Sequence, residues 1–227
     1  MNSRWTIKPN PNPDIVNSLM QSLGVGKPIA RLLAQRGINS FEEAKKFFRP
    51  NLKDLHDPYL MRDMDKAVAR IEKALAEEEN IMVYGDYDVD GTTSVALMSS
   101  YLKTRYPNVA TYIPDRYNEG YGVSYQGIDF AADNDISLII ALDCGIKAID
   151  KVVYAREKGI DFVICDHHRP GEKIPEAAAV LDPKREDCEY PYKELCGCGV
   201  GFKLIQALAK KRGDSIQVLL PYLDLVA

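Results

Sequence analysis

Residues 84–94 have the sequence Tyr84-Gly85-Asp86-Tyr87-Asp88-Val89-Asp90-Gly91-Thr92-Thr93-Ser94. The apolar run Ile81-Met82-Val83 precedes them and predicts a buried parallel strand. An apolar-periodic segment from Ser94 to Tyr101 follows them and predicts a helix. Three carboxylates at alternate positions therefore lie where a strand ends and a helix begins. In an open α/β sheet this place, outside the carboxyl end of a strand, is where ligands bind.

The carboxylates of Asp86, Asp88 and Asp90 repel one another, and three ionised groups so close together need a compensating positive charge. A divalent cation of the Mg²⁺ or Mn²⁺ kind, which prefers oxygen ligands, supplies that charge. An EF-hand loop is excluded, because counting from Asp86 places Leu97 where a bidentate Glu is required. A turn that only caps a helix is disfavoured, because capping uses one acid. We therefore predict a metal site.

Composition indicates a globular protein with one ordinary domain and a smaller appendage. The chain has 227 residues, of which 46% are hydrophobic and 27% charged. No apolar run is long enough to span a bilayer and no signal peptide opens the chain, so we expect a cytoplasmic protein away from membranes. The five cysteines are expected to be reduced thiols. The net charge of −4 leaves room for a local nucleic-acid site, since metal ions would offset the acids.

The chain is expected to have a helical segment over residues 1–62, with helices at 14–23, 28–35 and 41–48. The turn Leu23-Gly24-Val25-Gly26-Lys27-Pro28 resembles the turn of helix–hairpin–helix modules, whose N–H groups can hold a nucleic-acid phosphate. A tight connection between two packed helices is the alternative, and we favour it.

Residues 63–227 are expected to form the main domain. A helix from 63 to 79 precedes alternating strands and helices, which predict right-handed βαβ units and a doubly wound, mostly parallel five-stranded sheet. The expected strands are 81–85, 109–113, 138–142, 162–165 and 178–181, and the expected helices are 93–105, 124–133, 146–158 and 200–211. The segment 215–227 has a helical pattern without a terminal cap, so we expect a sequence truncated at its C-terminus.

Further polar residues follow two other predicted strands. Asp143-Cys144-Gly145 comes after 138–142, and Asp166-His167-His168 comes after 162–165. In a parallel sheet these residues meet Asp86 at one edge. Imidazole together with several carboxylates suits Mn²⁺ or a similar metal, and the set is large enough for two ions. Two ions indicate hydrolysis of a phosphoester, because one ion activates water and both stabilise charge on the phosphate. A zinc hydrolase is disfavoured, since no His-rich tetrahedral set is visible.

The order of these motifs resembles the DHH phosphoesterase superfamily: Asp-Tyr-Asp-Val-Asp-Gly, then Leu-Asp-Cys-Gly, then Cys-Asp-His-His, then a Gly-rich run at 197–201. Within it, Ile113-Pro114-Asp115-Arg116, Gly120-Tyr121-Gly122 and Pro170-Gly171 are most similar to the RecJ family of exonucleases. The resemblance covers essentially the whole chain. It implies Mn²⁺- or Mg²⁺-dependent 5′-to-3′ hydrolysis of single-stranded DNA in repair and recombination. It also implies a helicase or a single-strand-binding protein as a partner.

The resemblance assigns roles to residues of this sequence. Asp86 is implied to bind a metal or to support a ligand, Asp166 to orient the His pair, and His168 to contact the scissile phosphate or a metal. Arg116 is implied to hold a DNA phosphate at the 5′ end, and its alternative is a solvated loop arginine. The implied metal ligands are Asp88, Asp90, Asp143 and His167.

Two smaller features leave alternatives. Gly197 and Gly199 open a predicted helix, and their N–H groups would either hold a phosphate or permit a close helix–strand approach. Both interpretations stand. A zinc site built on Cys188, Cys196 and Cys198 is disfavoured, because their spacing is unusual for zinc.

One departure from the family affects the expected activity. The family carries a further Asp ligand downstream, together with a second domain and an oligonucleotide-binding fold, and the sequence ends at Ala227 before any of them. We therefore expect this chain alone to bind metal weakly and to hydrolyse little. Two other functions stay open: a phosphodiesterase for short oligonucleotides or cyclic dinucleotides, and a non-catalytic replication scaffold. The scaffold is disfavoured, because it should have lost acids that are all present here.

Overall fold

The computed structural model describes residues 4–226, which divide into two compact units with the boundary between Leu55 and His56. The boundary between the units precedes the one expected after residue 62, and the division into functional domains stays a prediction. Each unit is described by itself. Within residues 4–226, no helix combines the length and the apolar character that a bilayer crossing requires.

The first unit consists of three short helices, as its caps predict: α1 (Pro13–Leu23), α2 (Lys27–Gln35) and α3 (Phe41–Phe48). Ser40 and Glu43 form a capping box at the start of α3. Gly24 ends α1 with φ of +65°, a left-handed conformation that favours glycine. A small core of its own joins α1 to α2 through Val16, Leu19, Ala30 and Leu33.

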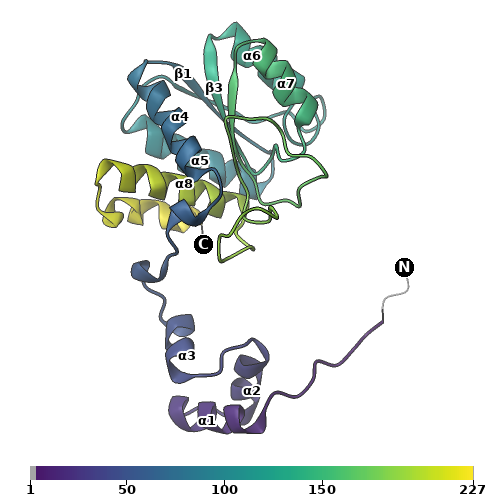
Figure 1. Ribbon diagram of the computed structural model, residues 1–227, viewed down its shortest axis with the longest axis vertical. Helices are drawn as coiled ribbons and strands as arrows, with labels where there is room; N and C mark the ends of the chain where they lie inside the picture. Colours follow the sequence, from purple (N-terminus) through teal and green to yellow (C-terminus); the bar gives the residue numbers. More distant parts are fainter. Residues whose placement is uncertain (1–3, 227) are drawn as a thin grey trace. The chain divides into compact units, whose positions relative to one another are not determined.

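The second unit is built on a five-stranded sheet in which every pair of neighbours is parallel, which confirms the predicted fold class (Figure 1). The strand order is β2-β1-β3-β4-β5. The strands are β1 (Asn80–Gly85), β2 (Val109–Tyr112), β3 (Ile136–Leu142), β4 (Asp161–Cys165) and β5 (Ala179–Leu181).

Helices cover both faces of the sheet. On one face α5 packs against β1 and α8, and α4 packs against α8 and β5, whereas on the other face α6 packs against β3 and α7 against β4. These helices are α4 (Met64–Ala76), α5 (Val89–Lys103), α6 (Tyr125–Asp133), α7 (Ile149–Glu157) and α8 (Gly197–Arg212). Short 3₁₀ turns occupy Leu52–Asp54 and Pro58–Leu60.

The last segment is helical, as its pattern predicts. Residues Ile216–Leu225 form a 3₁₀ helix that contains Pro221. Proline has no N–H group, and its ring clashes with the carbonyl one turn earlier, so it does not fit the interior of an α-helix. The helical pattern is therefore confirmed, and Pro221 accounts for the 3₁₀ form.

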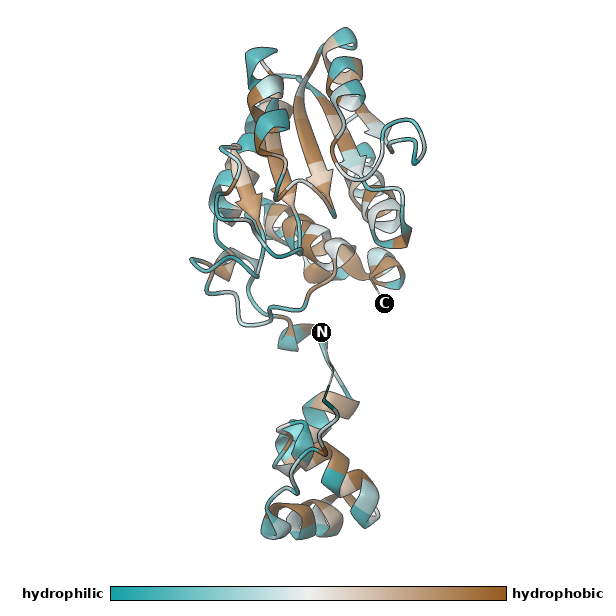
Figure 2. Cartoon of the chain, turned by 90° about the vertical axis from the view of Figure 1, so that its right-hand side faces the viewer, coloured by the Kyte–Doolittle hydropathy of each residue, from teal (hydrophilic) through white to brown (hydrophobic). Residues whose placement is uncertain are grey.

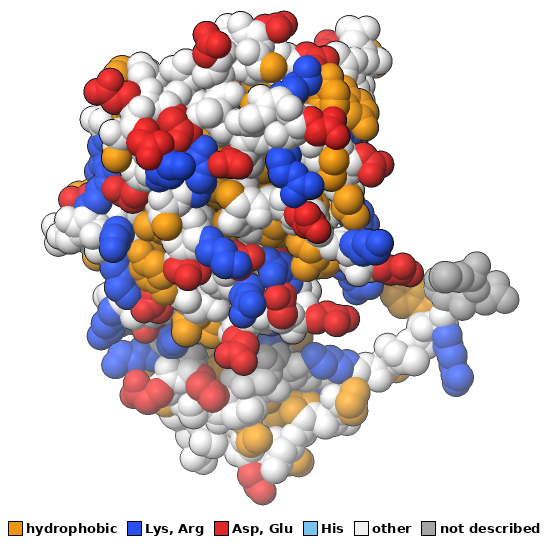
Figure 3. All heavy atoms as spheres, turned by 45° about the horizontal axis from the view of Figure 1, so that its top comes forward, with side chains coloured by type: hydrophobic (Ala, Val, Ile, Leu, Met, Phe, Trp, Pro, Cys, Tyr) orange, Lys and Arg blue, Asp and Glu red, His pale blue; other side chains and the backbone are white. Residues whose placement is uncertain are grey.

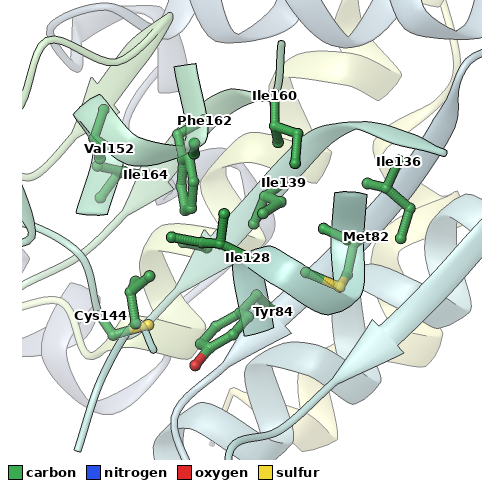
Figure 4. Packing of buried hydrophobic residues seen from close by; sticks show 14 of the residues in the cluster. Met82, Tyr84, Ile128, Ile136, Ile139, Cys144, Val152, Ile160, Phe162 and Ile164 are labelled. Atoms are coloured by element: carbon green, nitrogen blue, oxygen red, sulfur yellow. The ribbon is translucent and has the colours of Figure 1, made fainter. Parts of the chain in front are cut away.

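The strands are apolar on both sides because both faces of the sheet are buried. Met82, Ile139 and Phe162 point to the face that α6 and α7 cover, where they pack with Ile128 and Val152 (Figure 4). The residues between them along each strand face α5 and α8. The strands are accordingly the most hydrophobic part of the cartoon, whereas the exposed helix faces are polar (Figure 2).

The strand order predicts where a ligand binds on the sheet. From β1 the chain passes through α5 to β2 on one side, and then through α6 to β3 on the other side of β1. The order therefore reverses between β1 and β3, and the crevice outside the carboxyl ends of these two strands is the expected binding place.

We predict that Ile139→Ala lowers the free energy of unfolding by about 2–5 kcal/mol, because it leaves a cavity in the middle of the core. Ile139 is fully buried, whereas Val153 on α7 is 37% exposed, so Val153→Ala is the matched control and should change stability by less than about 0.5 kcal/mol. Urea unfolding followed by circular dichroism measures both. Equal losses in the two variants would contradict this account of the core.

Candidate metal centre

Aspartates follow four neighbouring strands at one level of the sheet edge. The register aligns the last residues of β1, β3, β4 and β5 in a single row. The residue that directly follows each of these strands is an aspartate, and each aspartate is at most 1% exposed: Asp86, Asp143, Asp166 and Asp182. Four carboxylates in one buried row require donors or cations to balance them.

Three oxygens of this row have no hydrogen-bond partner among residues 4–226: Asp86 Oδ2, Asp143 Oδ1 and Asp182 Oδ2. Burial raises the pKa of Asp86, and it raises the pKa values of Asp143 and Asp182 to about 6 each. A buried oxygen without a partner costs about 1–3 kcal/mol, and more when it is charged. The row therefore lacks positive charge, which a divalent cation would supply.

Asp143 has an unusual backbone. Its φ is +60°, in the left-handed region that non-glycine residues rarely adopt at a cost of about 1–3 kcal/mol. Its N–H donates to the carbonyl of Cys165 at 2.8 Å, which holds this conformation in the sheet. The first residue of α8 lies against its side chain: a Cβ added at Gly197 would be 2.5 Å from Asp143 Oδ1. The position of this carboxylate is thus imposed by two elements.

Two of the acids in residues 86–90 have different structural roles. Helix α5 begins at Val89, earlier than the expected start at residue 93, because Asp88 is its N-cap and accepts the Gly91 N–H at 2.9 Å. Asp90 lies in the first turn of α5, and its two oxygens accept the N–H groups of Gly197 and Cys198 at 2.7 Å each. One acid therefore caps the helix, and another joins α5 to α8.

His167 lies between two of these acids. Its Nε2 is 3.1 Å from Asp143 Oδ1 and 3.6 Å from Asp90 Oδ2, although the nearer contact does not have hydrogen-bond geometry. The carboxylate of Asp143 raises the pKa of His167. Ligand atoms of Asp143, His167 and His168 lie within 4.8 Å of one another, which is close enough for one metal ion. This set of nitrogen and oxygen donors suits Mn²⁺.

Asp166 contacts both histidines of the pair. Its Oδ1 accepts the N–H groups of His167 and His168 and lies 2.7 Å from His168 Nδ1, and its Oδ2 accepts the Ile146 N–H at 2.9 Å. Burial acts to raise the pKa of Asp166, but these hydrogen bonds outweigh burial and lower it. The ionised carboxylate in turn raises the pKa of His168. These contacts are those that a residue orienting the His pair would make.

A series of rings connects His168 to Arg116. His168 Nε2 lies 3.2 Å from the Tyr121 hydroxyl, the Tyr121 ring is 6.1 Å from that of Tyr87, and the Arg116 guanidinium is 5.2 Å from the Tyr87 ring. Arg116 is exposed and forms no ion pair within residues 4–226. It therefore lies beside the centre with its charge available.

The structure brings most of the predicted site residues together: Asp86, Asp88, Asp90, Asp143, Asp166, His167 and His168 occupy one edge. The glycines are different, because the N–H of Gly197 donates to Asp90 and that of Gly199 to Cys196 Sγ at 3.2 Å. The close approach of Gly197 to Asp143 supports the packing interpretation. A phosphate contact of Gly197 and Gly199 stays a prediction, and it would require their N–H groups to change partners.

Sequence reasoning missed Asp182 and gave Tyr121 no role. A usable signal existed for Asp182, because it directly follows the predicted strand at 178–181, as the other acids follow theirs. The zinc site finds no support among the described residues, where the candidate metal set contains no cysteine. Cys188 Sγ accepts the Arg62 N–H, Cys196 caps α8, and Cys198 Sγ donates to the Leu225 carbonyl.

We predict that Gly197→Ala weakens Mn²⁺ binding at least tenfold, because the added Cβ would displace the Asp143 carboxylate. Gly199→Ala is the matched control, since a Cβ there meets its nearest atom, in Leu195, at 3.3 Å. Electron paramagnetic resonance of free Mn²⁺ measures both affinities. Unchanged binding in Gly197→Ala would show that Asp143 is not held as described.

A second prediction concerns the buried charge of Asp182. Its folded pKa of about 6 exceeds the unfolded value of about 3.9, so without metal its contribution to stability falls as the pH rises from 4 through 6. Asp182→Asn should therefore raise the free energy of unfolding at pH 7.5 by about 1–2 kcal/mol and change it little at pH 4. Urea unfolding in EDTA at both pH values tests this, with the exposed Asp133→Asn as control. A gain that persists at pH 4 would rule out the charge as its cause.

Comparison with known proteins identifies the family. Residues 80–227 match the DHH family, N-terminal domain. The single-stranded-DNA-specific exonuclease RecJ of Bacillus subtilis is 41% identical over 94% of this chain and 27% of its own length. The RecJ of Thermus thermophilus is 30% identical over 99% of this chain and 32% of its own length. The chain thus spans about three-tenths of the length of these curated relatives.

Comparison with solved structures finds the same family. An exonuclease RecJ bound to manganese is 31% identical and superposes with a TM-score of 0.66, covering 73% of this chain and 42% of that one. RecJ from Thermus thermophilus in complex with Mn²⁺ is 27% identical, with a TM-score of 0.76 over 96% of this chain and 30% of that one. These findings confirm the resemblance, and this chain belongs to the DHH family, as a homologue of the RecJ exonucleases over nearly its whole length.

Proposed function

We propose that this site hydrolyses phosphodiester bonds of single-stranded DNA, from the 5′ end, with one or two divalent metal ions. The observation that carries the proposal is the buried aspartate row, in which three oxygens have no partner among residues 4–226 and one of them, Asp143 Oδ1, lies 3.1 Å from His167 Nε2. The names of the relatives give the substrate class, since they are exonucleases specific for single-stranded DNA.

The residues present fit a metal ion of the Mn²⁺ kind. Asp143 and His167 would hold it, together with Asp88, Asp90 and Asp86, and a second ion is part of the proposal. Two related structures contain Mn²⁺. When bound, such ions act as Lewis acids on the phosphate and lower the pKa of a water molecule. The protein's own part is to hold the acids at the switch point in a fixed geometry.

His168 is proposed to donate a hydrogen bond to the phosphate. Asp166 fixes its ring through Nδ1 and raises its pKa, which favours the imidazolium form. A cationic donor stabilises the charge that gathers on the phosphate oxygens in the transition state. Its Nε2, which is near the Tyr121 hydroxyl in this structure, is the atom left to make that contact.

Two features support a DNA strand as the substrate rather than a short oligonucleotide or cyclic dinucleotide. The Arg116 guanidinium, which forms no ion pair within residues 4–226, lies 5.2 Å from the Tyr87 ring, and the Tyr87 ring lies 6.1 Å from that of Tyr121. Both rings can stack on bases. Residues 1–55 carry nine Lys and Arg against four Asp and Glu, whereas residues 56–227 carry 20 against 29. A basic segment suits contact with phosphates along a longer strand.

A non-catalytic scaffold remains the less supported alternative. A scaffold gains nothing from buried carboxylates that lack partners, because each of them costs stability without metal. A cytoplasmic location and a helicase or single-strand-binding protein as partner stay predictions. The location is supported by the five free cysteines, which are usual in a reducing compartment.

We predict that Asp143→Ala abolishes hydrolysis, by at least about a thousandfold, without unfolding the protein, because it removes the carboxylate that both α8 and the sheet hold in place. Degradation of 5′-labelled single-stranded DNA with Mn²⁺ measures activity, in this chain and in a protein of the relatives' full length. Circular dichroism checks the fold, and the exposed Asp133→Ala is the control. Wild-type turnover in Asp143→Ala would remove the metal-site hypothesis.

A further inference from the structure

A groove runs along helix α2 in the first unit. It lies between α2 and the segment that precedes α1, which is fixed to the carboxyl end of α2: Lys8 Nζ donates to the Gln35 carbonyl, and the Gln35 side chain donates to the Pro9 carbonyl at 3.2 Å. Two cavities, of about 600 and 290 Å³, form this α2 groove and share Lys27 and Arg31 in their walls. None of these residues belongs to the candidate metal centre.

The α2 groove is basic. Lys8, Lys27 and Arg31 line it, and within residues 4–226 no acidic side chain lines it and none of the three cations forms an ion pair. The face of the molecule drawn in Figure 3 is different, because cationic and acidic side chains are interspersed there. The groove therefore keeps a positive charge that the protein itself does not neutralise.

Apolar side chains lie beside these cations. Ile7 and Leu32 line the groove and are 94% and 52% exposed. Trp5, which is 97% exposed, comes two residues before Ile7, so its Cα is at most about 7 Å from that of Ile7. Exposed apolar side chains that gather beside polar ones mark an interaction surface. The groove therefore suits a ligand that carries both negative charge and flat apolar groups.

A single strand of DNA has both properties. Its phosphates follow a basic groove, while its unpaired bases are free to stack on aromatic side chains. A duplex keeps its base faces stacked inside, so it would use the cations but not Trp5 or Ile7. The distribution of charge adds to the attraction, because residues 1–55 have a net positive charge and residues 56–227 a net negative one.

We propose that the α2 groove binds a single strand of DNA, with backbone phosphates at Lys27 and Arg31 and a base on Trp5. The inference rests on the proposed function for the class of ligand. It adds a second binding site for the strand, in a unit that takes no part in the metal centre. Because one strand can occupy two sites, each site raises the effective concentration of the strand at the other.

The test uses the single tryptophan of the chain, Trp5, as a fluorescent reporter of the groove. The whole chain is titrated in EDTA, which prevents metal-dependent hydrolysis, with a thymidine oligonucleotide of about 16 nucleotides. The strand should quench Trp5. Lys27→Gln/Arg31→Gln should weaken binding at least tenfold and lower the slope of log K against log salt by about 1.4, because two phosphate contacts are lost. Both residues are exposed, so the variant should fold.

The matched control is Lys45→Gln/Lys46→Gln, which removes the same charge from the exposed part of α3 in the same unit. It should weaken binding less than about twofold. A second pair of variants tests the base contact through the anisotropy of a labelled strand. Trp5→Ala should weaken binding at least fivefold. Phe48→Ala removes an aromatic ring that is 57% exposed at the end of α3 and should leave the affinity unchanged.

Three results would overturn the proposal. They are strand binding that leaves Trp5 fluorescence unchanged, equal losses of affinity in the two lysine and arginine variants, and displacement of the strand by a duplex or by polyglutamate as readily as by an unlabelled strand. Groove-dependent binding in a protein that never degrades DNA would refute the proposed function instead and leave the groove standing. Degradation of DNA with groove-independent binding would do the reverse.

Discussion

The balance of negative charge in the aspartate row at the carboxyl edge of the sheet is the constraint on which the rest of the structure depends. The protein balances part of it: Asp166 receives three backbone N–H groups and the His168 ring, and Asp90 receives two N–H groups from the start of α8. The negative charge on Asp86, Asp143 and Asp182, each of which has one oxygen without a partner among residues 4–226, is left unbalanced. Of these oxygens, Asp143 Oδ1 lies among the grouped ligand atoms of His167 and His168, which is where a cation would balance the charge.

The aspartate row determines the local structure of the elements that surround it. Helix α8 begins with glycine because a side chain at residue 197 would occupy the place of the Asp143 carboxylate. Asp143 adopts a left-handed backbone, and a hydrogen bond to β4 holds it there. Such local strain is common where a ligand must be held in one geometry, and the large core on both faces of the sheet provides the stability that tolerates it.

Much of this arrangement was predictable, for identifiable reasons. Buried parallel strands are continuous apolar runs, so all five strands were located within two residues, and the acids that follow three of them pointed to the site. The start of α5 was placed too late, because Asp88 was counted as a ligand and not as a cap. The glycines of α8 were ambiguous, since a phosphate cradle and a close packing contact both require glycine. Asp182 was missed, although it follows its strand in the same way as the others.

The sequence by itself determined the parallel sheet, its helices and the set of acids and histidines at one edge, because hydrophobic periodicity and the direction of parallel strands suffice for that. Only the tertiary structure decided which oxygens remain without partners and that Asp90 is bound by α8. These facts depend on contacts between residues more than a hundred positions apart, or on loops that meet only at the sheet edge. No local pattern encodes such distances, because they are set by how the helices pack on the sheet.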